Sequence, residues 1–433
     1  MILRWIVLIV FASVYAFLCL SSRHRAKALW LGIAVLVLAR HLLAGQDPEG
    51  ALTLRALFTR AVNWNVLGVL AGAMLVADLF MASGVPVLLA DRIADRCRTT
   101  RMAMVAVCLF SGLVSAFVDN VTTVLLVSPV ALAIARRTRS SPVPLLIGIA
   151  VSANLQGAAT LIGDPPSMIL AGFFRLSFND FFVYLGRPSL FFAMQAGALA
   201  SAVVLFVLFR RHREPMTPVD VEPPKTWVPV AFISVMVLFL ATSSYFDPGF
   251  RWLAGTGNLA LGTLAFLWGL RREPEEAKRI LKRYDLPTVF FLAGIFVITY
   301  AMDRFGWVKA IANLIAGLVG TNRFAAYTLI VWLSVLVSAF IDNIAYVALM
   351  LPVTKDLGEA VGGDPFLYAA GLLIGACLGG NVTPIGASCN VVAVGILRRE
   401  GHPVSFWQFA RIGLPFTLAA TLAGYAFVWA FWH

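Results

Sequence analysis

Two copies of one short acidic motif constrain what this chain can fold into. Residues 115–120 (Ser-Ala-Phe-Val-Asp-Asn) and 338–343 (Ser-Ala-Phe-Ile-Asp-Asn) differ at one position and lie 223 residues apart in a chain of 433. Each copy places a carboxylate and an amide in the middle of a long apolar run. A charge at membrane depth costs about 3 kcal/mol or more unless a partner compensates it. The motifs therefore predict an ion or substrate site, whereas the simpler alternative is two helix ends that carry Asp-Asn by chance.

Composition identifies the medium in which this chain folds. Hydrophobic residues make up 60% of the sequence, charged residues 13%, and the mean hydropathy is +0.86. These values lie far from those of soluble domains and predict a multi-pass protein of the plasma (inner) membrane. The net charge of +12 comes from short basic clusters between apolar runs, which is the distribution expected of membrane topology and not of nucleic-acid binding.

A second repeated motif marks two helices that break within apolar runs. Thr160-Leu161-Ile162-Gly163 aligns with Thr383-Pro384-Ile385-Gly386 at the same offset of 223 residues. One fixed offset over two separate motifs indicates an internal duplication. We therefore predict two repeats, residues 1–213 and 227–433, joined by a cytoplasmic linker at 214–226.

The predicted fold class is an all-α polytopic membrane protein with about ten transmembrane helices, two re-entrant hairpins and two broken helices in two inverted repeats. The hairpins are expected at 102–135 and 324–354, and the broken helices at 143–174 and 366–396. Amphipathic interfacial segments are expected near 84–97 and before residue 320. Because basic residues flank both ends of the first hairpin, the positive-inside rule predicts that it enters from the cytoplasm. The second hairpin is then expected to enter from the opposite face.

The hairpin tips and helix breaks supply the candidate binding residues. Unpaired backbone groups at such ends are tolerated at membrane depth only where they line a wet or ligand-filled cavity. Hydroxyl, amide, carbonyl and carboxylate oxygens suit a hard cation or a proton. The candidate substrate- or ion-binding residues are Asp119, Asn120, Thr123, Thr160, Gly163, Asp164, Ser167, Asp342, Asn343, Thr383, Gly386, Ser388 and Asn390.

The charge of these runs restricts the solute. No Lys or Arg lies in the same runs as the three Asp residues, so a di- or tricarboxylate would meet net repulsion unless cations came with it. A neutral hydroxylated solute or a small cation fits better. For Thr160 and Ser167 an ordinary helix-to-helix hydrogen bond is an equally good reading.

Other polar groups in apolar runs have alternative explanations. Arg40 can extend to the membrane surface, and Asp78 is either part of the site or a partner for Arg40. Cys389 can pack as a small hydrophobe or bind a thiophilic metalloid. The five cysteines form no CxxC pair, so we predict no disulfide and no structural zinc.

At these residues the sequence resembles the ion transporter superfamily, in particular the branch of arsenite permeases and P-permeases. The run 159–166 (Ala-Thr-Leu-Ile-Gly-Asp-Pro-Pro) resembles the break motif of that branch, and Phe-x-Asp-Asn resembles its hairpin tips. Sodium/proton antiporters of the NhaD type and divalent anion/sodium symporters are relatives. The symporters typically carry Ser-Asn-Thr at the tips, so Asp119-Asn120-Val121 favours the arsenite-permease side. Ser167 stands where relatives often have Asn.

The resemblance implies an elevator-type carrier, often a homodimer. We predict a secondary transporter that couples efflux of a neutral metalloid hydroxide, such as arsenous or antimonous acid, to protons. Sodium/proton antiport and sodium-coupled carboxylate transport are the alternatives within the class, and a channel is a weaker one. No catalytic motif and no cofactor are expected beyond the coupling ion, H⁺ or Na⁺. The chain has no phosphate-binding loop, so ATP drive would need a separate ATPase subunit.

Overall fold

A computed structural model describes residues 2–20, 24–215 and 223–433, and within these ranges the chain is almost entirely helical. The helices of the first half are α1 (Ile2–Leu20), α2 (Arg25–Leu42), α3 (Leu54–Ala56), α4 (Trp64–Ala82), α5 (Val85–Asp95), α6 (Thr100–Ser115), α7 (Asn120–Arg137), α8 (Val143–Gly157), α9 (Pro165–Phe174) and α10 (Leu190–Leu208). The helices of the second half are α11 (Val228–Phe246), α12 (Leu253–Arg272), α13 (Pro274–Arg283), α14 (Leu286–Arg304), α15 (Trp307–Val319), α16 (Arg323–Ser338), α17 (Asn343–Val361), α18 (Pro365–Gly379), α19 (Ser388–Arg399) and α20 (Phe406–Trp432). A two-stranded antiparallel sheet pairs β1 (Val183–Tyr184) with β2 (Arg187–Pro188).

Local sequence signals explain where the helices begin. Side chains of Asn63, Thr99 and Asn322 cap α4, α6 and α16 by accepting a backbone N–H three residues later. A capping box formed by Ser405 and Gln408 starts α20. Proline occupies one of the first two positions of α5, α9, α14 and α18, where its missing N–H is not needed.

Eight segments of the described residues are long and apolar enough to cross a membrane. They are Trp64–Ala82, Asn120–Arg137, Leu190–Leu208, Val228–Phe246, Leu253–Arg272, Pro274–Arg304, Pro365–Val382 and Phe406–Trp432. Shorter apolar helices accompany them, among them α6, α8, α9 and α16. Because a full span needs about 20 residues, these shorter helices end before they could cross.

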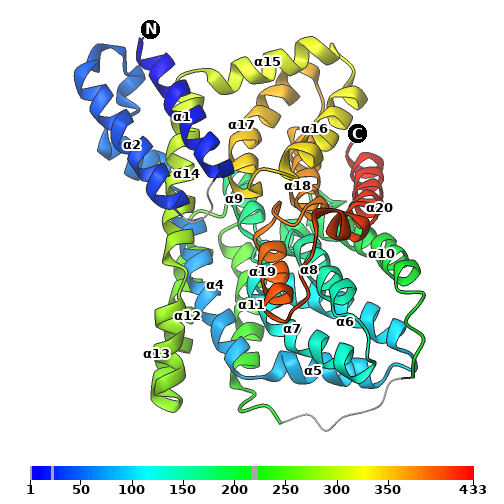
Figure 1. The fold of residues 1–433 in the computed structure, drawn as a ribbon. Helices are drawn as coiled ribbons and strands as arrows, with labels where there is room; N and C mark the ends of the chain where they lie inside the picture. The colour runs from blue at the N-terminus through cyan, green and yellow to red at the C-terminus, as the bar shows by residue number, and fades with distance from the viewer. Residues whose placement is uncertain (1, 21–23, 216–222) are drawn as a thin grey trace.

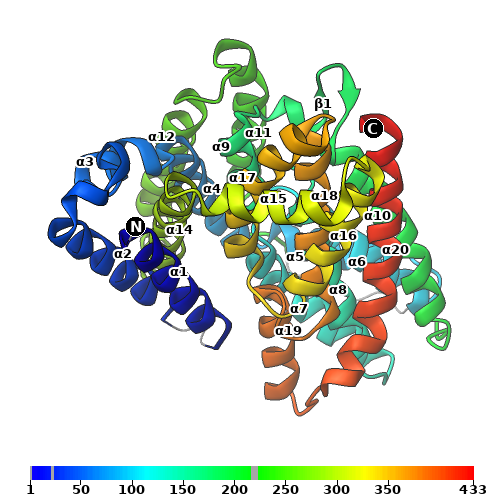
Figure 2. The same ribbon diagram turned by 90° about the horizontal axis from the view of Figure 1, so that it is seen from above.

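The two halves place corresponding elements at opposite ends of the molecule. Helix α15 begins 222 residues after α5, close to the offset of the motifs, and both connect a long helix to a helical hairpin. Figure 1 shows α5 across one end and α15 across the other, and Figure 2 shows α15 lying over α16, α17 and α18. The hairpin α6–α7 lies on the side of α5, whereas α16–α17 lies on the side of α15. This arrangement agrees with the predicted inversion of the two halves.

Helices α4 and α12 pack with their backbones in contact. A Cβ atom on Gly72 would lie 2.1 Å from the carbonyl oxygen of Asn258, and one on Gly262 would lie 2.5 Å from that of Gly72. Gly68 and Gly255 face each other in the same seam. Small residues permit such close packing in membrane helices. In Figure 1 this pair lies with α13 and α14 on one side of the molecule, and α8, α10 and α20 lie on the other.

The predicted fold class, an all-α polytopic membrane protein, is confirmed. The predicted hairpin 102–135 corresponds to α6 and α7, and the predicted broken helix 143–174 to α8 and α9. The division into two domain-like repeats, and the face of the bilayer from which each hairpin enters, stay predictions. The central part of the predicted linker, 216–222, lies outside the described residues.

The structure decides between the alternatives for Arg40 and Asp78. Arg40 pairs with Asp47, with 3.1 Å between Nε and Oδ2, and not with Asp78. The suggestion that Asp78 is a partner for Arg40 is therefore wrong. Asp78 instead faces the large central cavity described below.

Candidate functional site

The first acidic motif forms the sharp connection between α6 and α7. Asp119 is the N-cap of α7, and its Oδ2 accepts hydrogen bonds from the backbone N and the Oγ1 of Thr122 at 3.0 and 3.2 Å. Thr123 Oγ1 donates to the carbonyl of Asp119 at 3.0 Å. The Asp-Asn sequence thus starts a helix inside an apolar region, as an N-cap carboxylate does.

The second motif repeats this geometry between α16 and α17. Asp342 Oδ1 accepts the backbone N–H groups of Ile344 and Ala345 at 3.0 and 3.4 Å. Its other oxygen, Oδ2, is 3.2 Å from Nη1 of Arg25 on α2. The two caps are therefore equivalent, but only the second has a guanidinium beside it among the described residues.

Matching hydrogen bonds join each helix break to the hairpin of its own repeat. Thr160 Oγ1 donates to the carbonyl of Ala116, and Thr383 Oγ1 donates to the carbonyl of Ala339. Both pairs are separated by 44 residues, so the contact is the same in each repeat. Thr160 is fully buried, which makes it a brace for the break and not a residue that a solute can touch.

Glycine is required where each break meets its hairpin. A Cβ on Gly163 would lie 2.3 Å from the carbonyl oxygen of Gly157, and one on Gly386 would lie 2.6 Å from that of Gly380. No side chain fits at such distances, so the repeated glycine follows from a close approach of two backbone segments.

The restarting helices differ in how they are capped. Asp164 Oδ1 accepts the backbone N–H of Ser167 at 3.0 Å and so caps α9. In the second repeat Asn390 Nδ2 donates to the carbonyls of Gly380 and Thr383 at 2.9 and 3.1 Å. Ser167 occupies the position equivalent to Asn390, and its buried Oγ has no hydrogen-bond partner among the described residues.

A chain of amides crosses the boundary between the repeats. Asn120 Nδ2 donates to Asn154 Oδ1 at 3.0 Å, and Asn154 Nδ2 donates to Asn381 Oδ1 at 3.0 Å. Asn154 Nδ2 also donates to the carbonyl of Cys377, its own counterpart 223 residues later, at 2.7 Å. Two equivalent positions can touch only near a symmetry axis, so a pseudo-twofold axis passes through this contact.

The hairpins and breaks enclose one cavity of about 760 Å³. Six predicted site residues line it, namely Asp119, Asn120, Gly163, Asp164, Asn343 and Ser388. Six others do not line it, namely Thr123, Thr160, Ser167, Thr383, Gly386 and Asn390. Asp342 is not part of the lining either, but its partner Arg25 is. The predicted residues therefore fall into two sets: those that line the cavity and those that do not.

The cavity is acidic but not free of positive charge. Asp78, Glu276 and Asp285 line it together with Asp119 and Asp164, and Arg25 and Arg283 are the facing cations among the described residues. No Lys or Arg lies in the acidic runs themselves, but the fold brings two from α2 and α13.

Sequence reasoning missed residues that reach the site from other elements. Arg25, Asp285 and Thr288 all lie far in sequence from the two repeated motifs, although all three line the cavity. Asn154 and Asn381 carried a detectable signal, because each is an amide within an apolar run near a predicted break.

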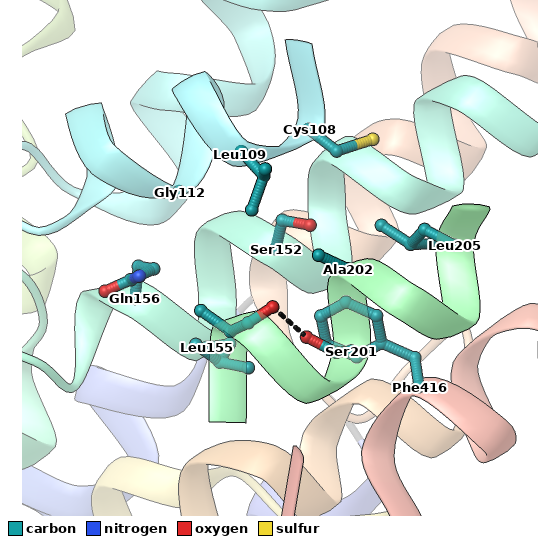
Figure 3. A pocket seen from close by; sticks show the side chains of 11 residues that line it. Cys108, Leu109, Gly112, Ser152, Leu155, Gln156, Ser201, Ala202, Leu205 and Phe416 are labelled. Atoms are coloured by element: carbon teal, nitrogen blue, oxygen red, sulfur yellow. Dashed lines mark hydrogen bonds between the residues drawn. The ribbon is translucent and has the colours of Figure 1, made fainter. Parts of the chain in front are cut away.

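A second cavity, between α6, α8, α10 and α20, is too small for a solute. Its volume is about 10 Å³, enough for one water molecule. Figure 3 shows Ser152 and Ser201 among apolar neighbours such as Leu155 and Phe416, with Ser201 Oγ bonded to the carbonyl of Ala198 at 3.1 Å. Within the described residues, the larger cavity is therefore the candidate binding site.

The fold and the cavity define a class, a multi-pass membrane transporter, and the comparisons with known proteins agree. An uncharacterized transporter of Mycobacterium bovis is 33% identical over 386 residues, which cover 85% of this chain and 86% of that protein. The P protein of Mus musculus is 28% identical over 510 aligned positions, covering 97% of this chain and 59% of that protein.

Two overlapping matches, to residues 6–372 and 259–432, identify the family. The chain belongs to the CitMHS family, which is described as the citrate transporter family. The YdaH transporter of Alcanivorax borkumensis, a crystal structure with an unusual topology, covers 94% of this chain with a TM-score of 0.62. Its sequence identity is 17%, so this likeness concerns the fold alone.

Proposed function

We propose that the chain is a secondary active transporter that couples efflux of a small neutral metalloid hydroxide, such as arsenous or antimonous acid, to a proton gradient. The observation that carries the proposal is the cavity of about 760 Å³, to which both repeats contribute acidic or amide residues. A site between two inverted repeats can be exposed to either side of a membrane in turn, which suits alternating access by an elevator-type motion.

The lining favours a neutral solute with several hydroxyl groups. Asn120, Asn154 and Asn343 offer amide donors and acceptors, and Ser388 adds a hydroxyl. Five carboxylates against two guanidinium groups leave an acidic cavity that repels a free anion. A neutral hydroxide meets no such repulsion and can hydrogen-bond to both the amides and the carboxylates.

The same carboxylates supply the coupling. Asp119 and Asp164 share the cavity and have no salt-bridge partner among the described residues. Like charges in one cavity repel each other, and uptake of H⁺ or Na⁺ relieves that repulsion. Binding of the coupling ion at Asp119 therefore changes the energy of the conformations that the transporter visits.

A second candidate is transport of a citrate-like carboxylate together with a cation. The family description favours it, and Arg25 and Arg283 give the cavity two groups that can bind carboxylates. Sodium/proton antiport without a further solute is the third candidate, since it needs only the acidic residues.

Uptake into everted membrane vesicles tests these candidates. Arsenite, ²²Na⁺ and citrate with or without Mg²⁺ are compared, each with and without an imposed pH gradient. We expect gradient-driven uptake of arsenite, and we expect Asp119→Asn to abolish its dependence on the gradient. The exposed Glu275, which pairs with Lys278 outside the cavity, provides the control variant Glu275→Gln.

The result also ranks the candidates. Uptake of citrate only with Mg²⁺, and none of arsenite, would establish the second candidate in place of the first. Gradient-dependent ²²Na⁺ movement alone would establish antiport. If the Asp119→Asn variant still takes up arsenite in response to the gradient, Asp119 is not the coupling carboxylate.

A further inference from the structure

The two acidic caps have the same local structure but a different neighbour. Asp119 and Asp342 each start a helix, and each uses one carboxylate oxygen to accept backbone N–H groups. The neighbours differ: Asp119 also accepts a hydrogen bond from the hydroxyl of Thr122, and Asp342 has a guanidinium beside it. Arg25 lies against Asp342, whereas no Lys or Arg pairs with Asp119 among the described residues.

Arg25 is held in place by three different groups. Its Nη1 is 3.2 Å from Asp342 Oδ2, and its Nη2 donates to Thr288 Oγ1 at 3.1 Å. Its guanidinium carbon lies 4.8 Å from the centre of the Phe291 ring, a cation–π distance. Thr288 Oγ1 in turn donates to Asp285, so the hydroxyl links the guanidinium to a second carboxylate.

Arg25 lies in the cavity beside the second cap, where a bound cation would lie, and is mostly shielded from solvent. The side chains of Arg25 and Asp342 are 21% and 23% exposed, and Arg25 lines the cavity next to Asn343 and Ile344. Asn343 is the counterpart of Asn120, which lines the cavity beside Asp119. Asp119 can bind a cation at the first cap. At the second cap, the guanidinium of Arg25 already occupies the equivalent place beside Asp342.

We propose that Arg25 is a built-in cation that occupies the ion site of the second repeat, so that Asp119 provides the single exchangeable cation site. This inference rests on the proposed coupling by Asp119. It predicts one coupling cation for a fold whose duplication offers two equivalent positions. It also makes Arg25 a residue that determines stoichiometry, since removing it frees the second position.

The groups that face Asp342 all bear on the test. They are Arg25 on α2, Asp285 and Thr288 at the start of α14, and the hydroxyl of Tyr15 on α1, which donates to the carbonyl of Ala345 at 2.8 Å. Arg283 lines the same cavity from α13. Removing Arg25 leaves Asp342 without its cationic partner, a state that favours uptake of Na⁺ or H⁺.

Thermal unfolding of the purified full-length protein in detergent measures cation binding without transport. The Tm is recorded at pH 8.5 in NaCl and in choline chloride of equal ionic strength, and over pH 5.5–8.5 in choline chloride. The parent protein should already show a rise of Tm with Na⁺, or with falling pH, from the site at Asp119, and we expect this rise to be larger in Arg25→Gln. The double variant Arg25→Gln/Asp342→Asn should lose this gain.

Two variants serve as controls. Arg25→Lys keeps a cation at the site and should respond as the parent protein does. Lys27→Gln removes an exposed cation from the same helix and should also leave the response unchanged. An Arg25→Gln variant whose Tm follows Na⁺ and pH as in the parent protein would overturn the proposal.

The double variant decides the case in which Arg25→Gln does not fold. A folded double variant would support the proposal, because the uncompensated Asp342 is then the defect. A double variant that is equally unfolded would overturn it, because the guanidinium would then support packing and not charge balance. Neither result depends on whether arsenite is the solute. The Tm measurements therefore test the role of Arg25 even if the vesicle assay shows no arsenite transport.

Discussion

Residues at equivalent positions of the two repeats make the same contacts. Thr160 and Thr383 make the same hydrogen bond, and Gly163 and Gly386 allow the same close approach. Their repetition at the two breaks predicts a role in binding, with an ordinary hydrogen bond as an equal reading for Thr160. Their repetition instead reflects backbone geometry that both repeats share, and a pattern of residue types alone cannot distinguish the two causes.

Positions at which the two repeats carry different residues indicate function more clearly than positions at which they agree. Asn154 corresponds to Cys377, and Asp164 corresponds to Ala387. The amide and the carboxylate are therefore found on the first repeat only, and both line the cavity. Asymmetry of this kind concentrates polar groups on one side of the pseudo-twofold axis.

Asp247 provides a pH-dependent prediction at this scale. It lies in the connection between α11 and α12, and its Oδ2 accepts the backbone N–H groups of Arg251, Trp252 and Leu253 at 2.9, 2.9 and 3.0 Å. Slight burial acts to raise the pKa of Asp247, but the three N–H donors and the charge of Arg251 outweigh it and lower the pKa below its usual value.

A lowered pKa in the folded state stabilises the protein above the pKa of the unfolded chain, about 3.9, and this stabilisation is lost as the pH falls through the folded value. We expect Asp247→Asn to reduce the fall in Tm between pH 5 and pH 3. The measurement is a set of melting curves at several pH values. Equal slopes for variant and parent would show that this turn does not contribute to acid unfolding.

At the scale of elements, the breaks determine where helices can end within the membrane. α8 and α18 have 15 residues each, α9 has 10 and α19 has 12. Each is too short to span a bilayer alone, which needs about 20 residues. Side chains satisfy part of the backbone at or near their ends: Asp164 caps α9, Asn381 donates to Val151 of α8, and Asn390 donates to the carbonyls of Gly380 and Thr383.

The glycine at the second break tests this account. We expect Gly386→Ala to lower stability by about 1–3 kcal/mol or to prevent folding, because its Cβ would overlap the carbonyl oxygens of Gly380 and Ala339 at 2.6 and 2.9 Å. Gly395→Ala on α19 is the matched control, since no atom lies within 4 Å of the added Cβ. The readout is the Tm of the purified protein. A Gly386→Ala variant as stable as Gly395→Ala would show that the break can widen.

At the scale of the whole molecule, the duplication produces a site that neither repeat contains by itself. The cavity takes Asp119 and Asp164 from the first repeat, Asn343 and Ser388 from the second, and Arg25 from outside both hairpins. Helices α5 and α15 lie at opposite ends of the molecule, as the predicted inversion requires (Figure 1). A binding site shared in this way is suited to opening toward either end.

Inversion makes a prediction about topology. Arg98 and Thr321 are exposed counterparts, 223 residues apart, that precede α6 and α16. In a background without the five native cysteines, we expect Arg98→Cys to react with a membrane-impermeant maleimide only from the cytoplasmic side. Thr321→Cys should react only from the outside. Reaction of both positions from one side would contradict the inverted arrangement.

The sequence by itself determined the helical class, the repeated motifs, the position of the breaks and six of the residues that line the cavity. It could do so because apolar length, caps, glycines and a fixed offset are local properties of the chain. Only the tertiary structure decided that Arg25 lies against Asp342, that Asn154 bridges the repeats and that Thr160 is a brace. These contacts join residues up to 317 positions apart, so they depend on how helices pack and leave no local pattern in the sequence.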